Sequence, residues 1–202
     1  MVWDELTRDA DSENARDRER WTGVYIGVLA VLLAVCAMGG GNAAKDATLK
    51  NIEAANTWAF FQAKNMRRHV LRVAADDLQL RLVSDPGLTP EGRVAIEAKI
   101  AEYKKQDDIL TRDPDREPDK REGLDQLWEK GKALEIERDV AMRQDPYFDY
   151  GEALLQIAIV LASISIITRG TFLLAGSAVL GGLGALMTVN GFTLAFTLPW
   201  LG

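Results

Sequence analysis

The chain has 202 residues, of which 27% are charged and 48% are hydrophobic, and its formal net charge is −6. Acidic and basic residues are interleaved, so the sequence offers no clustered basic face for a nucleic acid. The single cysteine, Cys36, excludes an internal disulfide, and its position inside an apolar run indicates a small buried hydrophobe.

The N-terminal part predicts a polar tail followed by a membrane span. Residues 1–21 are polar and mixed in charge, which is typical of a solvated tail or a short surface helix. Residues 21–44 are 24 uncharged positions, so we expect a first transmembrane helix over 22–44. A cleaved signal peptide is the competing interpretation, but the preceding segment is long and holds more acids than bases. Gly39, Gly40 and Gly41 predict that the helix breaks or loosens as it leaves the bilayer.

Residues 45–150 predict a helical stalk outside the bilayer, beginning with one long helix over 45–84. Apolar side chains there recur at alternating steps of three and four, the heptad pattern of a coiled coil. A helix of 40 residues is about 60 Å long. The predicted seam, which includes two polar positions, consists of Leu49, Ile52, Asn56, Ala59, Ala63, Met66, Val70, Val73, Asp77 and Leu80.

Two shorter helices complete the predicted stalk. A turn at 84–87 precedes Thr89, an expected N-cap, and a helix over 90–111. A charged, proline-containing linker at 113–119 leads to a helix over 120–144, and Asp145 with Pro146 is expected to start a new segment. Because the chain must return to the bilayer, we predict an antiparallel arrangement of one helix leading out and two leading back.

The C-terminal part predicts a pair of transmembrane helices. Only Arg169 interrupts the uncharged sequence from 153 to 202, so we expect a second span at 151–169 and a third span with an apolar tail at 170–202. Pro199 limits further helix, and Trp200 suits the membrane interface. Small side chains recur along the third span and favour close helix packing, either against the second span or between copies. This candidate membrane helix interface consists of Ser177, Gly181, Gly184, Ala185 and Thr188.

The sequence therefore predicts an all-α membrane protein. Its three transmembrane helices, one N-terminal and two in a C-terminal hairpin, flank an elongated antiparallel helical or coiled-coil domain outside the membrane. The lone histidine, His69, has no second His or Cys nearby, so we expect no metal, no cofactor and no nucleophilic triad. The acids at 113–119 imitate a calcium loop, but Pro118 stands where glycine is needed. The spans hold few polar groups and no ionisable residue inside the membrane, which counts against active transport.

Two stretches resemble a bacterial membrane family, domain of unknown function 4337. They are EAANTWAFFQAK at 53–64, followed by Arg67 and Arg68, and GEALLQIAIVL at 151–161. The resemblance implies one span, a helical middle and a C-terminal pair of spans, and it implies no activity. The first stretch supplies a candidate partner or packing surface, which we interpret either as helix packing or as a groove for a partner. Its residues are Asn56, Trp58, Phe60, Phe61, Gln62 and Lys64.

These features favour a non-enzymatic structural or scaffolding protein of the bacterial inner membrane. Its partners are lipid, further copies of itself and other membrane proteins, as a homo-oligomer or as an accessory subunit of a larger complex. An oligomeric channel or pore is the alternative, since backbone and hydroxyl groups can line one. The arginines before the first span and at the last turn favour a cytoplasmic N-terminus and a periplasmic middle domain. The opposite orientation is favoured by Lys45, Lys50, Arg138 and Arg143.

Overall fold

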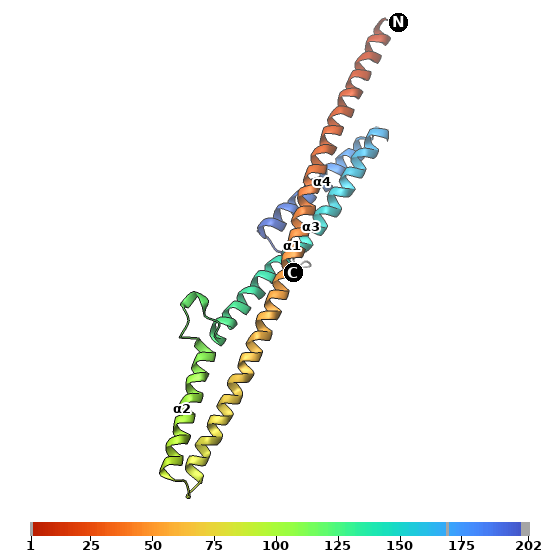
Figure 1. The fold of residues 1–202 in the computed structure, drawn as a ribbon. Coiled ribbons are helices and arrows are strands. Elements are labelled where there is room, and N and C mark those ends of the chain that lie inside the picture. The colour runs from red at the N-terminus through yellow and green to blue at the C-terminus, as the bar shows by residue number, and fades with distance from the viewer. Residues whose placement is uncertain (1, 169, 199–202) are drawn as a thin grey trace. The chain divides into compact units, whose positions relative to one another are not determined.

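The computed structural model describes residues 2–168 and 170–198, with side chains from Arg16 onward apart from residue 119. This part of the chain is all-α (Figure 1). The expected roles of Arg169, Pro199 and Trp200 fall outside it. The helices are α1 (Val2–Ser84), α2 (Pro90–Arg112), the short 3-10 helix η1 (Pro118–Lys120), α3 (Leu124–Thr168) and α4 (Thr171–Thr193).

The predicted break at the three consecutive glycines is wrong, because α1 continues through them without interruption. A Cβ atom at Gly39 would lie 2.5 Å from Cε1 of Phe148, and one at Gly40 would lie 3.1 Å from Cβ of the same residue. These glycines therefore allow a close approach by α3, and the packing of an aromatic ring against them outweighs the low helix propensity of glycine. Gly41 has nothing within 4 Å of its added Cβ.

The predicted segment boundary at Asp145 and Pro146 is also wrong, because α3 runs through Pro146 as one helix. Proline in a helix removes one backbone hydrogen bond and crowds the preceding turn, but it does not end the helix when neighbouring side chains hold both sides in place. Here the next two residues, Tyr147 and Phe148, are almost fully buried. The helix begins at Leu124, four residues later than expected, after the 3-10 turn at Pro118–Lys120.

Three helices contain stretches long and apolar enough to cross a membrane. They lie within Arg16–Ser84, Leu124–Thr168 and Thr171–Thr193. A chain with three such helices is expected to be a multi-pass membrane protein.

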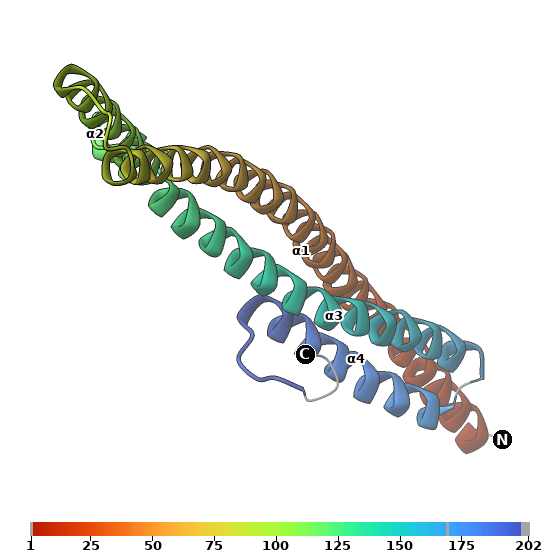
Figure 2. The same cartoon turned by 90° about the horizontal axis from the view of Figure 1, so that it is seen from below.

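The helices divide into two compact units, and the first combines the chain up to Ala47 with the chain from Asp139 onward. In it, the first part of α1, the second part of α3 and α4 pack together, and α3 and α4 lie side by side (Figure 2). Its buried core consists of Leu29, Cys36, Ala43, Phe148, Leu155 and Ala158. Large apolar side chains also point outward, among them Val28, Val31, Phe172 and Val179.

The second unit comprises Thr48–Arg138 and contains the remainder of α1, all of α2 and the start of α3. Thr89 caps α2 as predicted: its hydroxyl accepts a hydrogen bond from the backbone N–H of Gly92 at 3.1 Å. At the other end of α2, Asp113 adopts a left-handed conformation, and its carboxylate accepts a hydrogen bond from the N–H of Glu122 at 3.1 Å. The first acid of the calcium-like run is therefore used to close the linker.

Candidate interaction surfaces

The aromatic residues of the 53–64 stretch pack mainly against the start of α3. The ring of Trp58 lies edge-on to Phe61 and to Trp128, with centroid distances of 5.6 and 5.2 Å. Its indole Nε1 donates a hydrogen bond to Glu135 at 3.0 Å. A Cβ atom at Gly131 would lie 2.9 Å from the Trp58 ring, so glycine permits this approach. Edge-to-face pairs of this kind stabilise packing beyond the area they bury.

The chain's own Lys132 occupies the position that a ligand cation would take beside these rings. Its Nζ lies 5.9 Å from the Trp58 ring centroid and 5.7 Å from that of Trp128. Lys132 also lies 2.9 Å from Glu135, and this contact is the main cause that lowers the pKa of the Glu135 carboxyl. The cluster is thus a satisfied helix-packing contact, which matches the first of the two interpretations of the stretch for Trp58 and Phe61.

Other residues of the same stretch face elsewhere. Phe60 is 43% exposed and carries the ammonium of Lys64 at 4.7 Å from its ring centroid. Lys64 in turn donates to the backbone carbonyl of Glu122. Asn56 and Gln62 are exposed, and Gln62 borders an open hollow of about 470 Å³ together with His69 and four further residues of α1. A role for these side chains in binding a partner stays a prediction.

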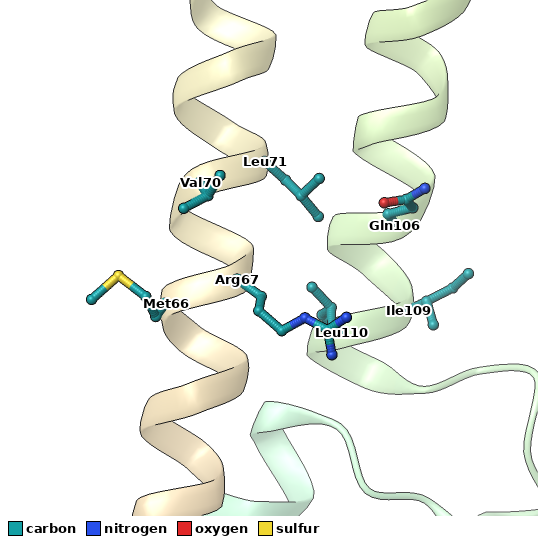
Figure 3. A pocket seen from close by; sticks show the side chains of 7 residues that line it. All are labelled: Met66, Arg67, Val70, Leu71, Gln106, Ile109 and Leu110. Carbon is teal, nitrogen blue, oxygen red and sulfur yellow. The ribbon is translucent and has the colours of Figure 1, made fainter.

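An apolar groove of about 440 Å³ runs between α1 and α2 (Figure 3). Leu71 and Arg67 reach from α1 toward α2, whereas Met66 points away from it. Beyond the groove, Arg72 makes a two-pronged ion pair with Asp107, with N–O distances of 2.8 and 2.9 Å. The hydrogen bonds from Arg72 hold the pKa of Asp107 below its usual value. Polar contacts therefore fix α2 on α1 at the edge of an open apolar surface.

The stripe of small residues on α4 is packed within the chain. Ser177 donates to the carbonyl of Ala158 at 2.6 Å, and its hydroxyl also lies 3.2 Å from the Tyr25 hydroxyl. A Cβ atom at Gly181 would lie 2.9 Å from Leu29, and one at Gly184 would lie 2.8 Å from Leu155.

Both α1 and α3 therefore approach the stripe closely. Thr188, like its neighbours on the stripe, is buried, while Ala185 is half-buried. The contacts favour the intramolecular interpretation, and a role between copies stays a prediction.

A matching family model covers almost the whole of this architecture. The model, described as Domain of unknown function (DUF4337), matches residues 18–194. The chain belongs to this family. Comparisons with curated proteins and with solved structures give no match. Among the described residues of this DUF4337 member, no three His, Cys, Asp or Glu side chains gather where they could hold a metal ion.

The face of α1 that contacts the rest of this DUF4337 chain was not predicted from the sequence. The half-buried or buried positions of its second part include Ala54, Trp58, Phe61, Leu71 and Ala75. None of these belongs to the predicted heptad seam. The signal that could have indicated them is the Trp-Ala-Phe-Phe run itself, since its aromatics cannot all lie on one narrow stripe.

Proposed function

We propose that this chain is a non-enzymatic scaffolding protein of the bacterial inner membrane, acting as a homo-oligomer or as an accessory subunit of a membrane complex. The observation that carries the proposal is the contrast between the two units. The first surrounds a small core with outward-facing large apolar side chains, including Val31, Ile167 and Phe172, which suits lipid as the solvent. The second has a surface rich in ion pairs such as Lys50–Glu137, which suits water.

The proposed topology has three transmembrane helices, with a helical domain over 45–150 on one side of the membrane. The first span is N-terminal, and the other two form a hairpin. In our proposal the N-terminus and the turn near 169 face the cytoplasm, and the helical domain lies in the periplasm. This domain would provide the surface to which other proteins dock, because its apolar side chains are exposed along α1.

Thiol labelling of intact cells tests this topology. A cysteine replaces exposed Asp115 in the linker, and a membrane-impermeant maleimide is added before or after lysis. Native Cys36 is fully buried and serves as the silent background. Labelling of Asp115→Cys before lysis supports a periplasmic domain, and labelling only after lysis reverses the orientation. Release of the protein from membranes by alkaline carbonate would refute the membrane-spanning proposal as a whole.

A further inference from the structure

The predicted heptad seam of α1 is exposed along its whole length in the single chain. All ten seam positions from Leu49 to Leu80 are exposed, although eight of them carry apolar side chains. The other two are Asn56 and Asp77. The exposed fractions are 64% for Met66, 59% for Val70 and 68% for Leu80. In the proposed topology this surface faces water, where a long and largely apolar stripe marks an interaction site.

The seam lies on a different side of α1 from the face that the rest of the chain covers, although its Met66 and Val70 also border the groove between α1 and α2. Successive helix residues turn by about 100°, so Trp58, Phe61 and Leu71, which meet α3 and α2, project roughly 130–180° away from the centre of the seam. Figure 3 shows this division locally, with Leu71 directed at α2 and Met66 directed away from it. The second part of α1 therefore has two contact faces, and one copy of the chain covers only one of them.

We propose that the seam pairs with the same seam of a second copy, as a parallel, in-register coiled coil over residues 49–80. These 32 residues form a stripe about 48 Å long. The alternating steps give Leu49, Asn56, Ala63, Val70 and Asp77 the first core position of each heptad, usually written a. The second core position, written d, is held by Ile52, Ala59, Met66, Val73 and Leu80. A strict heptad repeat is self-complementary, because two identical parallel helices place the same core residues opposite each other in every layer.

The length and regularity of the seam indicate a helix of equal length as its partner. α2 has 23 residues, and only the start of α3 belongs to this unit, so the covered face of α1 changes partner part-way along. Its side chains change accordingly, from Trp58 and Phe61 against α3 to Leu71 and Ala75 beside α2. The seam keeps one register over its full length, and a second α1 offers the same unbroken register.

The polar positions fit the parallel register. Asn56 would meet Asn56 of the second copy in one core layer, where two side-chain amides can hydrogen-bond; a single buried Asn of this kind specifies register and a two-stranded state. Asp77 would meet its own counterpart, which is unfavourable, but each Asp77 is paired with Arg81 at 3.1 Å. The layer is therefore tolerated at the end of the seam while adding nothing to affinity.

The flanking positions are also compatible with this arrangement. In a parallel pair, the residue before a first core position lies beside the residue five places further along the other helix. Asp76 would therefore lie beside Arg81 of the second copy, and Gln62 beside Arg67. The three remaining flanking pairs, Thr48 with Glu53, Ala55 with Phe60 and His69 with Ala74, bring no acid against an acid.

This inference rests on the proposed function in two respects, which are the water around the seam and the direction of the two helices. The seam begins five residues after the first apolar stretch ends at 44. Two copies held in one bilayer by that stretch would start their seams at the same depth and run in the same direction, which favours parallel over antiparallel pairing.

Disulfide trapping of the full-length protein in native membranes tests the register. Val70→Cys places thiols in facing core positions, within the Cα separation of about 7 Å that a disulfide requires. Gln79→Cys is the matched control, since it is exposed on α1 but outside the seam. We expect Val70→Cys to cross-link at least roughly tenfold faster than the control on mild oxidation, because disulfide geometry is strict. Equal rates, or no cross-link at Val70→Cys, would overturn the proposal.

A mixed pair and a charge substitution complete the test. Co-expressed Leu49→Cys and Leu80→Cys chains would join to each other only in an antiparallel pair, so that product would refute the parallel register. Val70→Glu should convert the dimer to a monomer by mass in mild detergent, with unchanged circular dichroism because Val70 is exposed in the single chain. If the protein resists carbonate extraction and is labelled as proposed but forms no cross-link along the seam, this inference alone is refuted. Release of the protein by carbonate would refute the proposed function.

Discussion

Replacement of Gly39 and of Gly41 by alanine should have opposite effects on stability, although the two glycines lie two residues apart in one helix. An alanine methyl at Gly39 would lie 2.5 Å from Cε1 of Phe148 and 2.9 Å from Cζ of Phe192. Gly41 has open space around its added Cβ. The gain in helix propensity, about 1 kcal/mol, is common to both substitutions and cancels in the comparison.

The magnitude follows from how firmly the Phe148 ring is held. Phe148 is 2% exposed, lies against Gly39, Gly40 and Gly191, and stacks edge-on to Phe192 at a centroid distance of 4.8 Å. A ring enclosed on these sides cannot swing away, so the substitution overpacks the site at a cost of about 1–3 kcal/mol. Gly39→Ala should therefore melt roughly 2–12 °C below Gly41→Ala, using about 2–4 °C per kcal/mol for a chain of this size.

Thermal unfolding of the two detergent-solubilised full-length variants, followed by circular dichroism, measures this gap. Shortening the ring with Phe148→Leu should shrink the difference, because the clash and the ring are coupled. Equal melting temperatures for Gly39→Ala and Gly41→Ala would refute the close approach. They would restore the simpler expectation that these glycines only loosen the helix.

Three further substitutions should report on the contacts outside the spans. Asp107→Asn should destabilise the protein at pH 7 by at most about 1 kcal/mol, because Arg72 lowers the pKa of this acid; the difference from wild type should vanish as pH falls below the ordinary 3.8 through the folded value. Asp145→Asn should do the reverse and stabilise at pH 7, because burial raises the pKa of Asp145 and the charged form is disfavoured; this gain should also vanish below 3.8. Trp58→Phe should lower the melting temperature by about 2–6 °C, because the hydrogen bond to Glu135, worth about 1–1.5 kcal/mol, is lost. Melting curves recorded at pH 7 and at pH 3 check all three substitutions.

Most of the helices could be predicted from local features of the sequence. Uncharged stretches of sufficient length predicted three apolar helices, and Thr89 followed by Pro90 predicted the start of α2 at the residue where it begins. Such signals succeed because length and capping act within a few residues of the chain. The family resemblance, carried by the stretches at 53–64 and 151–161, is confirmed by the family match.

The errors arose where tertiary packing overrides local preference. Gly39 and Pro146 are breakers by propensity, yet both lie inside helices in a region packed around Phe148. The partner of each small residue could not be predicted either, because Ser177 and Gly181 suit any closely approaching helix. Only the structure shows that Tyr25, Leu29 and Ala158 fill that role.

The stripe and the seam show why a periodic pattern identifies a contact face without identifying its partner. The stripe on α4 is covered by the chain itself, whereas the seam on α1 is left open by it. Trp58 and Phe61 of the 53–64 stretch pack against Trp128 of the same chain. The chain therefore covers these two aromatic side chains itself, and the seam of the same helix is the surface that a second copy would cover. An assembly that left residues 49–80 in water would need another physical reason for ten consecutive core positions in strict heptad register.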